Sequence, residues 1–177
     1  DRALSYSTMK WLLKSPKWYA HMKKKGMTET QALRDGTLVH KEILEPEKYN
    51  DFTFVDTSSK NTKKWQLAKQ THGADKTYTL KEKYMANRIV SAFLQNDAAV
   101  SFMKKAETEV PALVEIDGLA IRGKADILKP GQYIADVKTT NDGLKEIVLR
   151  NGEVTNQFKY TIEKYDYDLQ AYLYAQL

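Results

Sequence analysis

Three β-like runs lie close together in the second half of this 177-residue chain, over residues 109–116, 119–128 and 132–138. Asp117-Gly118 separates the first two runs, and Lys129-Pro130-Gly131 separates the last two. An Asp-Gly pair between alternating apolar residues is a strong β-hairpin signal, because both residues tolerate the positive φ angles of a tight turn. The stretch therefore predicts a three-stranded antiparallel meander.

Helical patterns lie on both sides of this meander, where apolar residues recur at three- and four-residue steps. Two capping boxes, Thr28 with Gln31 and Thr79 with Glu82, mark helix starts. The fold class expected is α/β or α+β, with a central mixed sheet that contains the meander of residues 109–138 and is flanked by helices. The other expected elements are helices over 7–25 (broken at Pro16), 28–45, 79–96, 97–105 (capped by Asp97) and 161–177, and a turn at Asn141-Asp142-Gly143.

The composition excludes several functional classes. Cysteine is absent, which rules out a disulfide scaffold, a thiol nucleophile, a zinc finger and a cysteine-ligated iron–sulphur cluster. A metal must therefore be held by oxygen or by histidine nitrogen. No apolar run reaches about 18 residues, so no membrane-spanning helix is expected. The net charge of +5 favours a polyanionic partner.

The register of the first predicted hairpin brings two acids together. A two-residue loop sets Ile116 opposite Leu119, and Glu109 then falls opposite Asp126, with their Cβ atoms about 5 Å apart. Glu115 has the same parity as Glu109 but lies about 20 Å away along the strand. The register therefore favours Glu109 as the partner of Asp126.

The second hairpin adds a third acid and a lysine. A three-residue loop sets Leu128 opposite Gln132, and Asp136 becomes the diagonal neighbour of Asp126 on the same face, about 7–8 Å away. Lys138 is two residues further along and shares that face.

Acids that face one another destabilise a sheet, so this cluster needs compensation. A divalent cation provides it, because hard cations favour carboxylate oxygens. The alternative is a solvated surface on which Arg122 and Lys124 neutralise the acids. The pattern alone leaves both interpretations open.

The same residues resemble a known nuclease signature. Asp126, nine further residues, then Asp136-Val137-Lys138 resembles the PD-(D/E)XK motif, with Ala125 in place of its proline. Further strings, spread from residue 4 to residue 174, resemble the RecE (exonuclease VIII) group of this superfamily, in that group's order. They are Leu4-Ser5-Tyr6-Ser7, Ser15-Pro16, Gly36-Thr37-Leu38-Val39-His40, Leu44-Glu45-Pro46, Glu109-Val110-Pro111, Asp136-Val137-Lys138-Thr139-Thr140 and Tyr167-x-x-Gln170-x-x-x-Tyr174.

The resemblance implies a restriction-endonuclease-like core that uses Mg²⁺, with Mn²⁺ able to substitute. In this group it implies a 5′→3′ exonuclease that acts on double-stranded DNA ends in recombination. It also implies a single-strand annealing protein as partner, a ring-shaped homo-oligomer, and the cytoplasm of a bacterial or phage-infected cell, with no membrane partner. Residues 1–177 are expected to form a single nuclease domain that is incomplete at its C-terminus.

Carried over by position, the resemblance implies four metal ligands: His40, Asp126, Asp136 and the Val137 carbonyl. Glu109 is implied as an accessory acid, and Lys138 as the lysine beside the attacking water. Gln170 and Tyr174, one helical turn apart, are implied to orient the substrate or to support the lysine. Contacts with DNA are expected from a wider set: Ser7, Ser15, Arg122, Lys124, Thr139, Thr140 and Tyr167.

In phosphodiester hydrolysis, the cation and Lys138 would have separate roles. A cation held by Asp126 and Asp136 would polarise the phosphate and acidify water, while Lys138 would stabilise the charge that develops on the phosphate oxygens. Lysines that cluster in residues 10–25 and 60–64 could follow the DNA backbone. The alternatives are an endonuclease or RecB-like nuclease of the same superfamily, and a DNA-binding protein whose nuclease site is inactive.

Overall fold

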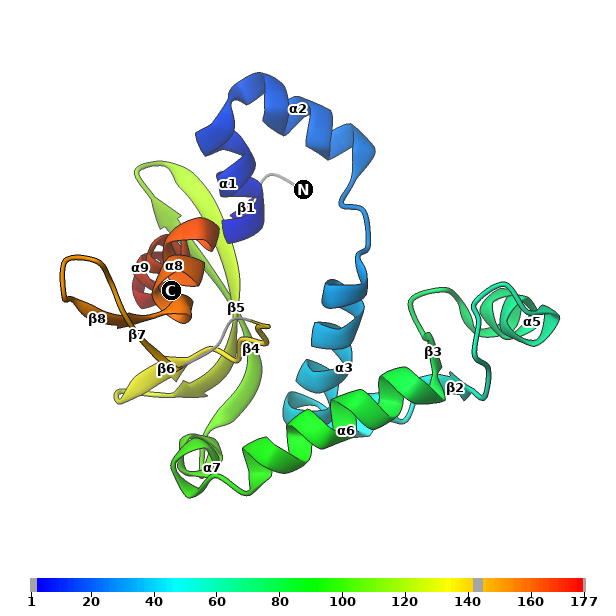
Figure 1. Cartoon of the computed structure of the whole chain (residues 1–177). Coiled ribbons are helices and arrows are strands. Elements are labelled where there is room, and N and C mark those ends of the chain that lie inside the picture. Colours follow the sequence, from blue (N-terminus) through cyan, green and yellow to red (C-terminus); the bar gives the residue numbers. More distant parts are fainter. Residues whose placement is uncertain (1–2, 142–144, 177) are drawn as a thin grey trace. The chain divides into compact units, whose positions relative to one another are not determined.

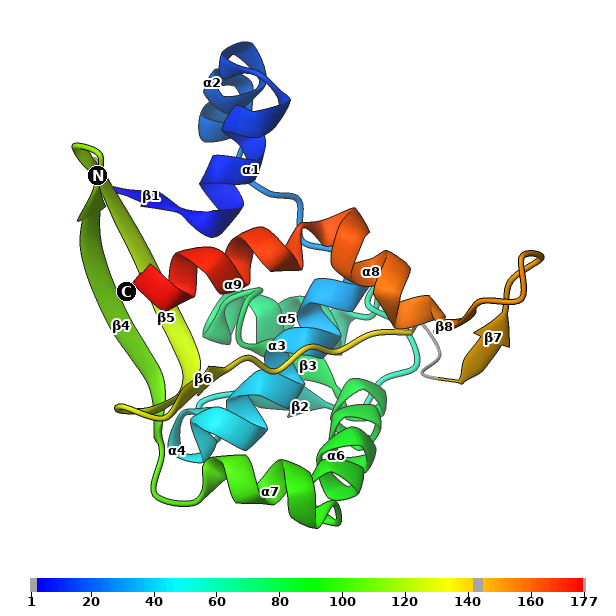
Figure 2. The same cartoon turned by 90° about the vertical axis from the view of Figure 1, so that its left-hand side faces the viewer.

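The computed structural model describes residues 3–141 and 145–176, and it has a mixed α/β architecture (Figures 1 and 2). The chain divides into two compact units, each built from stretches that are not contiguous in sequence. The first unit comprises Asp1–Met27, Val110–Ala125 and Lys138–Leu177, and the second comprises Thr28–Glu109 and Asp126–Val137. None of the helices within the described ranges is long and apolar enough to cross a membrane.

The second unit is mainly helical. Its helices are α3 (Gln31–Leu44), α4 (Pro46–Tyr49), α5 (Lys63–His72), α6 (Leu80–Leu94) and α7 (Asp97–Met103). Strands β2 (Thr53–Val55) and β3 (Thr77–Thr79) pair in parallel, and β6 (Tyr133–Ala135) pairs antiparallel with the end of β5 (Leu119–Lys129).

A small apolar core forms where α3 packs against α6 (Figure 1). Leu38 and Val39 on α3 are fully buried against Ala86 and Val90 on α6, together with Tyr78 on β3. Burying one side chain of the size of leucine or valine stabilises the folded state by about 1.5–3 kcal/mol. This packing fixes the position of α3, and His40 is the residue of α3 that follows Val39.

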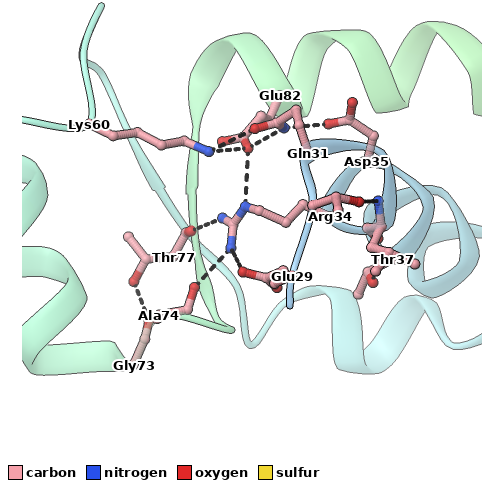
Figure 3. Close-up of polar contacts among 12 residues, drawn as sticks. Glu29, Gln31, Arg34, Asp35, Thr37, Lys60, Gly73, Ala74, Thr77 and Glu82 are labelled. Carbon is pink, nitrogen blue, oxygen red and sulfur yellow. Dashed lines mark hydrogen bonds and ion pairs between the residues drawn. The ribbon is translucent and has the colours of Figure 1, made fainter. Parts of the chain in front are cut away.

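A buried ion network joins the start of α3 to the start of α6 (Figure 3). Arg34 and Glu82 are both 7% exposed, and Arg34 Nε lies 3.3 Å from Glu82 Oε1. The guanidinium also donates to Glu29 and to the carbonyls of Ala74 and Thr77. Buried charges are tolerated only when paired and fully hydrogen-bonded, and this network meets that condition.

The first unit contains the meander hairpin and both ends of the chain. Strand β1 (Leu4–Ser5) pairs in parallel with β5, which in turn neighbours β4 (Glu107–Ile116) (Figure 2). Because β6 pairs antiparallel with β5, the sheet is mixed, as predicted. The other elements are α1 (Tyr6–Lys14), α2 (Pro16–Lys25), α8 (Gln157–Tyr165), α9 (Tyr167–Gln176) and an antiparallel pair, β7 (Glu146–Val148) with β8 (Val154–Asn156).

The predicted turn at Asp117-Gly118 is confirmed, since both residues have positive φ, 50° and 75°. The predicted register of the second hairpin is wrong by two residues. Leu128 pairs with Ile134 and not with Gln132, because the loop is Pro130-Gly131-Gln132. A shift of two residues keeps every side chain on its predicted face. If the pairing continued one residue beyond Ala135, it would set Asp136 directly opposite Asp126. The third strand is also shorter than predicted and ends at Ala135.

Several helix boundaries differ from the predictions. Thr30, not Thr28, caps α3 by accepting a hydrogen bond from the Leu33 N–H, and Asn96, not Asp97, caps α7. The single helix predicted for 161–177 begins at Gln157 and breaks at Asp166, which adopts a left-handed conformation. The Thr79–Glu82 capping box and the break before Pro16 are confirmed. In the turn predicted at Asn141-Asp142-Gly143, the last two residues lie outside the described residues.

The Glu82 network predicts acid sensitivity. Burial alone would raise the pKa of Glu82, but hydrogen bonds from Lys60, Thr79 and Gln31 outweigh it and lower the pKa from 4.5 to about 2. A lowered folded-state pKa stabilises the fold above about pH 4.5, and this contribution is lost as the pH falls through about 2. We expect Glu82→Gln to lower the free energy of unfolding at pH 7 by about 3 kcal/mol, with a smaller difference from wild type at pH 3.

Urea unfolding followed by circular dichroism at both pH values measures this difference. The exposed Glu115 on β4 provides the matched control, since Glu115→Gln should leave the pH dependence unchanged. Parallel pH profiles for wild type and Glu82→Gln would contradict the prediction.

Candidate metal centre

The first candidate ligand, His40, lies on α3 directly after two core residues, Leu38 and Val39. Its imidazole is half-buried, and Nδ1 lies 3.6 Å from Oδ2 of Asp126. Because the helix around it is anchored in the core, the position of the imidazole is set by packing and not by a mobile loop.

Asp126 lies on β5 between two buried apolar residues, Ala125 and Ile127, and is itself only 8% exposed. A buried carboxylate needs hydrogen-bond donors or a cation to offset its lost hydration. The backbone N–H of Val137 donates to Asp126 Oδ2 at 2.8 Å. This bond ties the segment after β6, which includes Asp136, to the Asp126 carboxylate.

Glu109 lies on β4 with a φ of 54°, which is unusual for a residue other than glycine within a strand. The left-handed backbone costs about 1–2 kcal/mol for a residue with a side chain, and such outliers cluster at functional sites. The Oε2 atom of Glu109 is shielded from solvent, as is Oδ2 of Asp136. The residue at this position is neither glycine nor asparagine, so the sequence carries no local signal for the left-handed conformation.

These three side chains converge. One ligand atom from each of His40, Glu109 and Asp126 lies within 4.8 Å of the other two. Two carboxylates at this separation repel one another strongly where solvent is excluded. A divalent cation removes the repulsion, and an imidazole nitrogen with carboxylate oxygens is a donor set that divalent metals accept. The residues therefore fit a divalent cation, without specifying which one.

The remaining predicted ligands, Asp136 and Val137, come ten and eleven residues after Asp126. Asp136 and Val137 follow β6 directly and are half-buried. Among the described residues, Asp136 does not belong to the group of three whose ligand atoms lie within 4.8 Å of one another. The Val137 N–H, not its carbonyl, makes the observed bond to Asp126.

Lys138, Gln170 and Tyr174 belong to the first unit. The half-buried Lys138 places its Nζ 4.8 Å from the centroid of the Tyr167 ring, within the range of a cation–π interaction. Gln170 is 7% exposed and Tyr174 is half-buried, both on α9. Tyr167, predicted from sequence as a DNA contact, is therefore also positioned to hold the lysine ammonium.

The other predicted DNA contacts are scattered over the first unit. Ser15 caps α2 by accepting from the Trp18 N–H at 3.0 Å, and the hydroxyl of Ser7 lies 3.0 Å from that of Ser5. The remaining four are exposed: Arg122 and Lys124 on β5, and Thr139 and Thr140 after β6.

Comparison with known proteins gives one match. The profile of a family described as "PDDEXK-like domain of unknown function (DUF3799)" matches residues 5–177. Searches of curated proteins and of solved structures gave no match. The matched range includes every residue proposed above as a metal ligand.

Metal binding should be measurable without any substrate. After treatment with EDTA, addition of Mg²⁺ or Mn²⁺ is expected to raise the midpoint of thermal unfolding, by the equivalent of about 2.7 kcal/mol at 100 times the Kd. Asp126→Asn and His40→Ala should remove most of this increase, whereas the exposed-site control Glu115→Gln should keep it. An equal increase in Asp126→Asn and wild type would place the cation elsewhere.

The backbone of Glu109 gives a second prediction. Glycine adopts positive φ without steric cost, so Glu109→Gly should be more stable than Glu109→Ala by about 1 kcal/mol. Glu107, exposed on the same strand, is the matched position, and its φ is not positive. There the order should reverse, with alanine more stable than glycine. Chemical denaturation of the four variants tests both orders, and the same order at both positions would contradict the strain at Glu109.

Proposed function

The chain belongs to a family of PDDEXK-like domains, which are members of a nuclease superfamily, and from this we propose that it is a Mg²⁺-dependent deoxyribonuclease. More specifically, we propose that the protein is a 5′→3′ exonuclease of the RecE type that degrades linear double-stranded DNA. Mn²⁺ is proposed to substitute for Mg²⁺.

The convergence of His40, Glu109 and Asp126 carries this proposal. A divalent cation held there supplies a Lewis acid that polarises a phosphate ester. Asp126 is the residue best placed as principal ligand, because it is buried and its carboxylate is oriented by the Val137 N–H. We assign Asp136, the next acid along that segment, and the Val137 carbonyl to the same ligand set.

We assign Lys138 an electrostatic role. Its ammonium would stabilise the negative charge that develops on the phosphate oxygens. The Tyr167 ring, 4.8 Å from Nζ, would restrict the lysine side chain and so reduce the entropy lost in positioning it. Gln170 and Tyr174, one turn apart on the same helix as Tyr167, are proposed to orient the substrate or to support this lysine.

The finer assignment rests on the strings shared with the RecE group, from Leu4-Ser5-Tyr6-Ser7 to the Tyr167–Tyr174 motif. On this basis we propose a role in DNA recombination, together with a single-strand annealing protein, in the cytoplasm of a bacterial or phage-infected cell. A ring-shaped homo-oligomer that encloses duplex DNA is proposed as the working form.

Substitution of the proposed catalytic groups should abolish cleavage. Asp136→Asn and Lys138→Ala are each expected to lower Mg²⁺-dependent cleavage of linear duplex DNA by roughly 100-fold or more, while circular dichroism shows a folded chain. Glu115→Gln and Lys104→Ala, which change exposed residues of the same types, are the controls and should retain activity. Full activity in Asp136→Asn or Lys138→Ala would refute this mechanism.

End-labelled substrates distinguish the nuclease classes. With Mg²⁺, early release of a 5′ label from linear duplex DNA, and no cutting of closed circles, is expected of a 5′→3′ exonuclease. Cutting of closed circles would identify an endonuclease instead. Retention of DNA without turnover in Mg²⁺ or Mn²⁺ would identify a DNA-binding protein with an inactive site.

A further inference from the structure

The positive charge of this protein is concentrated near its N-terminus. Residues 2–28 contain seven lysines and arginines and no acidic residue, whereas the rest of the chain holds 21 basic and 23 acidic residues. The whole positive excess of the chain therefore lies in this one segment. The segment forms α1 and α2, which we call the basic helix pair (residues 6–25).

Helix α2 has no buried residue. It packs against α1, and α1 in turn lies against α9 in the same unit (Figure 2). Tyr19 and Met22 are the half-buried residues of α2 and lie on one side of it. Lys17, His21 and Lys24 are exposed and follow i, i+4, i+7 spacing, so they form a stripe on another side.

The lysines of this pair differ in their partners. Lys10 on α1 is used within the unit, since its Nζ bonds the Tyr165 carbonyl and lies 3.4 Å from Asp166. The other five form no ion pair with any residue in the described part of the chain: Lys14, Lys17, Lys23, Lys24 and Lys25. Like charges so close together repel one another, and a polyanion relieves that repulsion.

Lys14 and the aromatic residues of α2 form a compact group. Lys14 Nζ lies 4.0 Å from the centroid of the Trp18 ring, and the His21 ring stacks on Trp18 at 5.5 Å. The Trp18 ring therefore contacts residues of the basic helix pair itself, and it positions the Lys14 ammonium at the surface. This arrangement favours contacts with a charged backbone over stacking on bases.

We propose that the exposed side of α2 is a docking surface for the phosphate backbone of DNA, separate from the residues that carry out cleavage. Lys17 and Lys24 on the stripe contact phosphates, with Lys25 beside them at the end of the helix, while Lys14 and Lys23 add to their field. Such a surface binds without sequence preference, and its affinity falls steeply with salt because bound counterions are released.

A basic helix can also bind an anionic membrane. The choice of DNA rests on the proposed nuclease function, and the residues of α2 agree with it. A membrane-binding helix has a continuous apolar face, whereas Trp18 is the one large hydrophobic residue exposed on α2, at 37%. The remaining large apolar groups of the helix, Tyr19 and Met22, lie on its half-buried side.

The test is fluorescence anisotropy of the full chain with a labelled DNA duplex in EDTA, over a series of salt concentrations. Changing Lys17, Lys23, Lys24 and Lys25 together to glutamine should weaken binding roughly tenfold or more at about 0.1 M salt. The slope of log K against log salt should fall in magnitude by about 3 to 4. The same four lysines changed to arginine should retain both the affinity and the slope.

The matched control changes four exposed lysines on other parts of the surface to glutamine: Lys69, Lys81, Lys104 and Lys145. It carries the same change of charge and should retain most of the affinity and most of the slope. An unchanged affinity and slope in the α2 variant would overturn the proposal, as would equal losses in the control. Circular dichroism establishes that each variant is folded.

Vesicles that contain phosphatidylserine separate the two polyanionic partners. Vesicle binding that depends on the α2 lysines, combined with unchanged DNA affinity, would overturn the proposal in favour of a membrane. Because the DNA measurement is made in EDTA, it does not depend on cleavage. DNA binding that requires α2 in a chain without nuclease activity would support this inference while refuting the proposed function.

Discussion

The close approach of two carboxylates and an imidazole is the constraint that shapes this protein. His40, Glu109 and Asp126 bring one ligand atom each within 4.8 Å of the others, although the two acids repel. The fold sustains this arrangement at a cost in free energy, since Asp126 is buried in β5 and Glu109 has a left-handed backbone in β4. Packing and backbone hydrogen bonds elsewhere must offset that cost. The three side chains are thereby already positioned for a divalent cation, which would offset the repulsion between the two carboxylates.

Helix α3 connects this site to the buried ion network of the same unit. Arg34 near the start of the helix is held by Glu82 and by the carbonyls of Ala74 and Thr77. Leu38 and Val39 fill the core one turn later, and His40 follows them directly. Glu82 also caps α6 through its bond with the Thr79 N–H. One buried ion pair therefore joins α3 to the start of the helix that packs against it.

Cleavage and DNA binding place opposite electrostatic demands on a nuclease. An acidic cation site repels the phosphates on which it must act, and outside residues 2–28 the chain has more acidic than basic residues. The docking surface proposed on α2 would resolve this conflict, because long-range attraction depends on summed charge while the chemistry depends on a few neighbouring groups. In the two proposed roles, the cation–π contacts of Lys14 with Trp18 and of Lys138 with Tyr167 would position the lysine ammonium groups.

The sequence by itself determined the local features, because short-range sterics and hydrogen bonds decide them. These are the Asp117-Gly118 turn and the Thr79–Glu82 capping box. Tertiary structure alone decided the register of β5 with β6, the parallel pairing of β2 with β3, the break at Asp166 and the left-handed Glu109. It also decided how closely His40 approaches Asp126. The pairing of β2 with β3 and the approach of His40 to Asp126 join residues far apart in the chain, and no local pattern contains the energies of those contacts.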